Sequence, residues 1–184
     1  MTHYQEILLI PTPEFNTNVV MNSLYDVLHH ALVAMSASDT AISFPGISST
    51  GLGNRVRLYT RPERLQQLSG HIAASAIRDH LKIGNILETP ETTEAMTVRR
   101  VQCKSNVERL RRRYMKRHGA SEQEAQSIIP ENSMKHLSLP YATLFSQSTG
   151  HSFRLFIQQQ KVTTPVKGLF NSYGLSDHAT VPMF

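Results

Sequence analysis

The sequence predicts an α+β fold in two parts, and three observations support this prediction. Over residues 1–97, strand-like and helix-like apolar patterns follow one another in the order β-α-β-β-α-β. Residues 98–184 begin with a dense basic segment of helical spacing and also contain two strand-like runs around a short polar turn. The first order is that of ferredoxin-like and RRM-like domains. We therefore expect an N-terminal ferredoxin-like (RRM-like) domain over 1–97 and a distinct C-terminal domain over 98–184, with an arginine-rich helix and a β-hairpin.

The elements of the first part follow from apolar spacing and from residues that interrupt regular structure. The opening run HYQEILLIP alternates like a strand, and the apolar residues of segment 19–35 recur at helical spacing. Two short strand candidates, AISFPG and NRVRLYT, flank a turn with two glycines. A second helix, RPERLQQLSGHIAASAIRDHL, is expected to break near Gly70, and IGNILETP closes the unit as a strand.

The acidic, polar segment ETPETTEAM at residues 88–96 is the expected boundary. VRRVQCK follows as a strand candidate, and SNVE at 105–108 matches a capping box that starts the basic helix, with Gly119 as its C-cap. A second capping box, SEQE at 121–124, starts another helix that must end before Pro130. The runs YATLFSQ and SFRLFIQQ form the expected hairpin, and the tail SYGLSDHATVPMF is expected to be a loop.

Composition limits the classes of protein that the chain can represent. With 184 residues, 40% of them hydrophobic, it is long and apolar enough to bury a core. Its single cysteine excludes an intramolecular disulfide and a multi-thiolate zinc site, and is typical of a reducing cytosol. No apolar run approaches the length of a membrane span, and no P-loop or dinucleotide fingerprint is present. We therefore expect a cytoplasmic protein with no membrane partner, no metal site and no cofactor.

Positive charge is concentrated in one segment of the chain. Residues 1–98 hold 6 Lys or Arg against 9 Asp or Glu, whereas residues 99–184 hold 13 against 5. Nine of those 13 basic residues lie between Arg99 and Arg117. A local basic stripe of this kind is the electrostatic footprint of a site that binds a polyanion.

The basic segment 106–118 has two faces when its residues are placed about 100° apart on a helical wheel. Five basic residues fall within one arc of about 140°. They are Arg109, Arg112, Arg113, Lys116 and Arg117. Val107, Leu110 and Tyr114 fall on the opposite side, where they can dock on the protein. Acids four residues away are nearly absent, which favours a nucleic acid over a purely solvated face, although the wheel does not choose between DNA and RNA.

One histidine on the first helix points away from the expected core. That core face consists of Val20, Leu24, Val27, Leu28, Ala31 and Met35. His29 lies almost opposite this set, so from the helix alone it is either an available functional group or an idle surface histidine. His30 lies about 100° further around the helix and becomes the available group if the register of the helix is shifted.

Several of these segments together resemble one known family. VRRVQCKSNVERLRRRYMKRHG, SQSTGHSFRLFI and SYGLS, with HYQEILLIPTPEF, LYDVLHHALV and SFPG before them, are similar in order and spacing to the CRISPR RNA-processing endoribonucleases of the type I-F (Csy) system. The resemblance spans nearly the whole chain and is least clear over 47–97. It implies a protein that binds the stem-loop of each CRISPR repeat and cuts pre-crRNA at the 3′ base of the stem without a metal. It also implies that the protein stays on the mature crRNA with other subunits of the type I-F Cascade (Csy) complex.

The resemblance also implies roles for individual residues. His29 matches the catalytic histidine, Ser146 the serine that positions the reacting ribose, and Tyr173 a tyrosine placed beside the histidine. Arg100 and Gln102 match the pair that reads bases at the foot of the stem. Their i, i+2 spacing places both on one face of a strand, and their side chains suit the edges of guanine and adenine.

Further matches concern the bound RNA. Phe153 matches an aromatic residue that stacks on the nucleotide near the cut, and Ser148 and Thr149 match positions close to the cleaved phosphate. The residues that match the helix in the RNA major groove are Arg112, Arg113, Lys116, Arg117 and His118. The family favours arginine at the position of Lys116, and lysine contacts phosphate without the bidentate fork of a guanidinium.

These residue types suit metal-free cleavage, because RNA carries its own nucleophile in the ribose 2′-OH. A histidine of ordinary pKa, about 6.5, can remove the proton of that hydroxyl. The oxygen then attacks the adjacent phosphate and leaves a 2′,3′-cyclic end. Two other functions fit the basic helix: a hairpin-binding subunit without catalysis, and a DNA-binding regulator.

Overall fold

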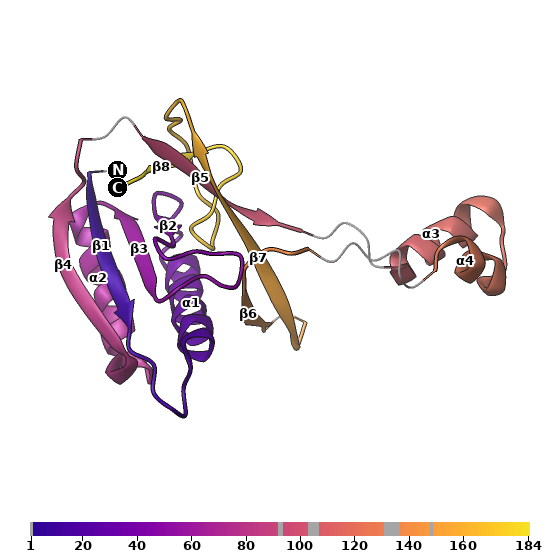
Figure 1. Cartoon of the computed structure of the whole chain (residues 1–184), viewed down its shortest axis with the longest axis horizontal. Coiled ribbons are helices and arrows are strands. Elements are labelled where there is room, and N and C mark those ends of the chain that lie inside the picture. The colour runs from indigo at the N-terminus through magenta and orange to yellow at the C-terminus, as the bar shows by residue number, and fades with distance from the viewer. Residues whose placement is uncertain (1, 92–93, 103–106, 131–136, 148) are drawn as a thin grey trace. The chain divides into compact units, whose positions relative to one another are not determined.

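The computed structural model describes residues 2–91, 94–102, 107–130, 137–147 and 149–184 (Figure 1). Contacts divide the chain into two compact units, one formed by residues 1–101 with 139–184 and the other by residues 102–138. The first unit holds two four-stranded sheets, and the second holds the basic helix. Among the described helices, none is both long and apolar enough to cross a membrane.

The α+β fold class is confirmed, and the first sheet is built from the β-α-β-β-α-β order that the sequence predicts. Its elements are β1 (His3–Leu9), α1 (Thr17–Ala34), β2 (Ala41–Ser43), β3 (Arg55–Thr60), α2 (Pro62–Ala73), the 3-10 turn η1 (Arg78–His80) and β4 (Leu81–Glu88). The strands are antiparallel in the order β2-β3-β1-β4. Helix α2 continues through Gly70 to its end at Ala73, so the break comes slightly later than expected.

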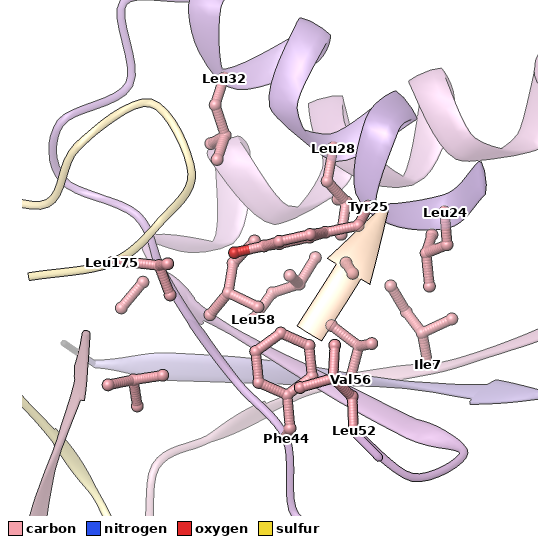
Figure 2. Packing of buried hydrophobic residues seen from close by; sticks show 14 of the residues in the cluster. Ile7, Leu24, Tyr25, Leu28, Leu32, Phe44, Leu52, Val56, Leu58 and Leu175 are labelled. Carbon is pink, nitrogen blue, oxygen red and sulfur yellow. The ribbon is translucent and has the colours of Figure 1, made fainter. Parts of the chain in front are cut away.

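Helix α1 packs on the first sheet and buries a face that differs in part from the expected one (Figure 2). The expected residues that are buried are Val20, Leu24, Leu28 and Ala31. Val27 and Met35 are only partly buried, whereas Tyr25 and Leu32 are buried as well. Tyr25 can be buried because its hydroxyl donates a hydrogen bond to the main-chain oxygen of Tyr173, at 2.8 Å.

The second sheet follows the first along the chain and contains the predicted hairpin. Its strands are β5 (Ala95–Val101), β6 (Tyr141–Ser146), β7 (His151–Val162) and β8 (Thr180–Pro182), in the order β6-β7-β5-β8. Strands β6 and β7 pair antiparallel, as the hairpin requires. The expectation of a loop for the whole tail is wrong at β8, which pairs with residues 95–97 of β5. A strand of three residues is too short to show an alternating pattern in the sequence.

Side chains of one sheet bond to the main chain of the other. Gln159 on β7 accepts a hydrogen bond from the N–H of Phe44 at 2.6 Å and donates one to its carbonyl oxygen at 3.0 Å. The hydroxyl of Tyr59 on β3 donates to the main-chain oxygen of Pro182 on β8 at 3.1 Å. Buried apolar residues from both sheets form one cluster. Both sheets therefore lie in the same compact unit. A domain boundary after residue 97 stays a prediction.

The second unit consists of α3 (Val107–His118) and α4 (Glu122–Ile128). Gly119 has a φ of 64° and follows the last residue of α3, as expected of a C-cap glycine. The predicted capping box of α4 is present, because Ser121 Oγ accepts from the N–H of Glu124 while the Glu124 carboxylate accepts from the N–H of Ser121. Helix α4 ends before Pro130, as predicted. The box expected at 105–108 lies partly outside the described residues.

Candidate active site

His29 on α1 is held by the segment around Tyr173. Its Nδ1 atom lies 2.8 Å from the main-chain oxygen of Ser172, and its ring stacks on Tyr173 with centroids 4.1 Å apart and planes at 9°. A carbonyl oxygen only accepts, so Nδ1 carries the hydrogen of this bond. In the neutral imidazole, Nε2 is then the acceptor. The structure thus fixes the ring and leaves one nitrogen able to take a proton.

A tight turn sets the position of Tyr173. The side-chain oxygen of Asn171 accepts hydrogen bonds from the N–H groups of Tyr173, at 2.9 Å, and Leu175, at 3.2 Å. Gly174 has a φ of 68°, and a Cβ there would lie 2.5 Å from a side-chain carbon of Ile42. Glycine is therefore required at this position, both for its backbone conformation and for the space.

The buried Tyr25 fastens this turn to α1. Its hydroxyl bonds to the main chain at Tyr173, and Tyr25 precedes His29 by one helical turn, so both lie on the same side of α1. Burial, and next the proximity of Tyr173, raises the pKa of Tyr25 well above the ordinary value of a tyrosine. The hydroxyl is therefore protonated at neutral pH and can donate this hydrogen bond.

Two further predicted residues join this group. The ring of Phe153 on β7 lies edge-on to Tyr173, with centroids 6.4 Å apart and planes at 78°. The guanidinium carbon of Arg100 on β5 lies 5.5 Å from the centroid of Phe153 and 5.6 Å from that of Tyr173, within range of cation–π attraction. The fold therefore gathers His29, Tyr173, Phe153 and Arg100 from four segments and includes a permanent positive charge among them.

Two other predicted residues, Ser146 and Thr149, belong to the hairpin between β6 and β7. Ser146 is the last residue of β6 and pairs with His151, the first residue of β7. Thr149 is exposed in the turn that joins the two strands. Ser148 lies outside the described residues. The hairpin therefore places Ser146 and Thr149 at its turn, close to one another along the chain.

Gln102 lies beyond the end of β5. The strand ends at Val101, whose partner on β7 is Phe156, and the ladder does not extend to Gln102. Gln102 is exposed and Arg100 is partly buried. The expectation that both share one face of a strand is therefore wrong, although the chain still places them two residues apart.

His30 has a different partner from His29. Its Nδ1 atom lies 3.5 Å from a carboxylate oxygen of Asp26, one helical turn earlier, and 43% of its side chain is exposed. The two histidine rings have centroids 5.6 Å apart. The register of α1 thus places His29 against the ring of Tyr173 and His30 against the carboxylate of Asp26.

Helix α3 presents the predicted basic face to solvent. Its exposed basic residues are Arg109, Arg112, Arg113, Lys116, Arg117 and His118. Val107 is buried, and Leu110 and Tyr114 are partly buried, so the two faces predicted by the helical wheel are confirmed. Arg111 lies outside the basic face, and its Nε donates to the carbonyl oxygen of Ile129 at 2.9 Å, which fastens the end of α4 to α3.

Two residues that support the candidate site, Asn171 and Tyr25, are not among the site residues predicted from the sequence. The pattern NSYG is typical of a turn and contains a signal for Asn171, because asparagine side chains bond to the main chain two residues on. Nothing local marks Tyr25, since its partner is 148 positions away in the sequence. Within the described ranges, no group of three or more His, Cys, Asp or Glu side chains is placed to hold a metal ion.

Comparisons with known proteins identify the family. The sequence matches the family described as CRISPR-associated protein (Cas_Csy4) over residues 4–184. A relative from Pseudomonas aeruginosa (strain UCBPP-PA14), named CRISPR-associated endonuclease Cas6/Csy4, is 43% identical over 187 aligned positions that cover 100% of both chains. A relative with the same name from Escherichia coli (strain UTI89 / UPEC) is 35% identical over 185 positions, again with 100% of both chains covered. The chain therefore belongs to the Cas_Csy4 family of CRISPR-associated proteins.

Proposed function

We propose that the protein is an endoribonuclease that binds the stem-loop of a CRISPR repeat and cleaves pre-crRNA at the 3′ base of the stem. The observation that carries this proposal is the imidazole of His29, which is stacked on Tyr173 and bonded through Nδ1 so that Nε2 is available as a base. The name of both relatives, CRISPR-associated endonuclease, supports the same activity.

The proposed reaction needs no metal ion. Nε2 of His29 takes the proton of the ribose 2′-OH, and a base of this kind typically accelerates a reaction about 10²–10⁴-fold. The 2′ oxygen forms a bond to phosphorus, the bond from phosphorus to the 5′ oxygen breaks, and the departing oxygen takes a proton from water. The products are a 2′,3′-cyclic phosphate and a 5′-OH.

The other predicted site residues position the RNA in this proposal. Ser146 holds the reacting ribose, which supplies the orientation that in-line attack requires. Phe153 stacks on the nucleotide next to the cut, while the fixed charge of Arg100 and the side chain of Gln102 read bases at the foot of the stem. Tyr173 supports the imidazole through ring contact.

The basic face of α3 is proposed to bind the stem itself. Its exposed cations can each approach a phosphate, and the helix reaches the A-form major groove where a loop or helix end opens it. Arg109 and His118 lie at the two ends of this face, and Ser148 and Thr149 contact the RNA near the cleaved phosphate. Because these contacts persist after the cut, the protein stays on the mature crRNA in the cytoplasm as a subunit of the type I-F complex.

A cleavage assay tests the proposal. A labelled hairpin taken from the repeat array of the same genome is incubated with the protein in EDTA, and we expect one cut at the 3′ base of the stem. We expect His29→Ala to bind the hairpin with unchanged affinity and to lose cleavage. Cleavage that requires magnesium, or a His29→Ala variant that cuts at the wild-type rate, would falsify the mechanism.

A further inference from the structure

The second sheet has an outer face that the proposed active site does not use. Strands β5, β6 and β7 contain no aspartate or glutamate, although they hold three arginines and a lysine. Successive residues of a strand point to opposite faces. The face turned to the core carries Ala142, Leu144, Leu155 and Ile157, all at most 2% exposed. Phe153 and Arg100 belong to that same face, because they pair with Leu144 and Ile157.

The opposite face, which we call the outer sheet face, combines aromatic and cationic side chains. It is formed by Arg99, Tyr141, Phe145, Arg154 and Phe156, and the register places Tyr141 opposite Phe156. Tyr141 is 41% exposed and Phe145 is 53% exposed. A solvated sheet face normally carries polar residues. The two exposed aromatics of β6, with Thr143 between them on the same face, therefore require another explanation than core packing.

The cations on the outer sheet face are held in place. The guanidinium of Arg154 lies 4.8 Å from the centroid of Tyr141, whose ring in turn lies 5.3 Å from that of Phe156. Nε and Nη2 of Arg99 both donate to the side-chain oxygen of Gln158, at 2.8 and 2.6 Å. Fixed guanidinium groups beside exposed aromatic rings lose little side-chain freedom when a ligand binds.

Unpaired RNA is the ligand that matches this chemistry. Bases stack on aromatic rings and on arginine planes, while phosphates are attracted to arginine, and exposed aromatics on a sheet are a common platform for single strands. The bases of a paired stem are stacked on one another and do not offer their faces. A protein partner would also cover aromatic rings, but the absence of acids from all three strands favours a polyanion.

We propose that the outer sheet face binds unpaired nucleotides that flank the repeat stem-loop. The flanking position rests on the proposed function, whereas the preference for single-stranded RNA rests on the outer sheet face alone. The site is separate from the group around His29, because Phe153 and Arg100 point to the other face of the same sheet.

Fluorescence anisotropy with three labelled RNAs tests this proposal. The probes are the bare repeat stem-loop, the same stem-loop with unpaired flanks and a 2′-deoxyribose at the proposed cut so that it stays intact, and a short oligouridylate. Each is titrated with the wild type, Phe145→Ala and Arg154→Gln. We expect the flanks to tighten binding by the wild type. We expect Phe145→Ala to lower the affinity for the flanked RNA and for oligouridylate about tenfold. We expect it to change the affinity for the bare stem-loop by no more than about twofold.

Controls keep the outcomes distinct. Leu169→Ala truncates a side chain that is 72% exposed in the segment between β7 and β8. This variant is expected to change none of the three affinities. Thermal unfolding confirms that each variant is folded. If no variant changes binding to flanked RNA and oligouridylate, the outer sheet face does not bind RNA, and a protein partner becomes its occupant. If the stem-loop itself does not bind, the proposed function fails, while the oligouridylate titrations still decide the role of Phe145.

Discussion

The contact between His29 and Tyr173 makes the tyrosine ring, rather than its hydroxyl, the group that supports the imidazole. The two rings are nearly parallel at 4.1 Å, and a stacked pair of this kind contributes about 0.5–1.5 kcal/mol beyond its buried area. We therefore expect Tyr173→Phe to cleave near the wild-type rate and Tyr173→Ala to cleave about 2- to 10-fold more slowly. Single-turnover cleavage at saturating enzyme measures this. A Phe variant as slow as the Ala variant would instead assign a chemical role to the hydroxyl.

The different partners of the two neighbouring histidines predict different effects of their removal. His30 pairs with Asp26 on the surface of α1, whereas His29 is bonded to Ser172 and stacked on Tyr173. We expect His30→Ala to keep cleavage within about threefold, and His29→Ala to lose about 10²-fold or more. Parallel rate measurements on the two variants decide this. The reverse order of effects would make His30 the base and would require another arrangement of the RNA.

At the scale of the element, α3 carries two kinds of basic residue: those exposed to solvent and one that bonds to the end of α4. Arg113 is exposed, while Arg111 bonds to the end of α4. We expect Arg113→Gln to weaken stem-loop binding and to lower the slope of log affinity against log salt by about 0.7–0.9 for each phosphate that the helix no longer neutralises. Arg111→Gln is the matched control, because it removes the same charge from the same helix. We expect it to destabilise the packing of α3 and α4 with a smaller effect on the slope, and equal slopes for both variants would contradict this distinction.

The capping box of α4 predicts a pH effect on this helix. Two hydrogen bonds to the carboxylate of Glu124 lower its pKa below the ordinary value of 4.5. The larger effect comes from the N–H of Ser121 and the smaller from the hydroxyl of the same residue. A lowered pKa in the folded state stabilises α4 above the pKa of the unfolded chain, and this stabilisation is lost as the pH falls through the folded value. The amide resonance of Ser121, followed by NMR against pH, should titrate below 4.5. Glu124→Gln should abolish this titration, and a midpoint at or above 4.5 would contradict the box.

Elements that depend on local spacing could be predicted from the sequence, and those that depend on distant partners could not. The two faces of α3 follow from helical period, and the inner one packs on the neighbouring α4. The buried face of α1 includes Tyr25, because the main-chain oxygen of Tyr173 accepts a hydrogen bond from its hydroxyl. That acceptor is distant in the sequence and could not be predicted locally. Strand β8 and the end of β5 at Val101 are likewise set by pairing between distant segments. In the candidate site, His29 could be predicted as the base from the family resemblance, whereas its hydrogen bond to Ser172 required the fold.

At the scale of the whole molecule, the two sheets of the first unit share one core. Buried residues of the first sheet, such as Leu58, and of the second, such as Leu155, belong to the same cluster. Gln159 ties them together further, because it satisfies both main-chain groups of Phe44. The site needs this union, since His29 comes from a helix of the first sheet and Phe153 from a strand of the second. We expect a shared core of this kind to unfold as one cooperative system.

We therefore expect Gln159→Leu to destabilise both sheets together. The substitution leaves the N–H of the buried Phe44 without its partner, whereas the carbonyl still accepts from the N–H of Ile47 at 3.1 Å. One unsatisfied buried group costs about 1–3 kcal/mol, so the expected loss is about 1–3 kcal/mol. Gln160→Leu, at an exposed neighbouring position, is the matched control and should change the free energy of unfolding little. Hydrogen exchange as a function of denaturant measures the stability of each sheet separately. The amides of β1 and β7 should lose protection with the same free energy of opening. Two separate transitions would show that residues 1–97 and 98–184 are independent domains, and that His29 and Phe153 meet only when two folded bodies dock.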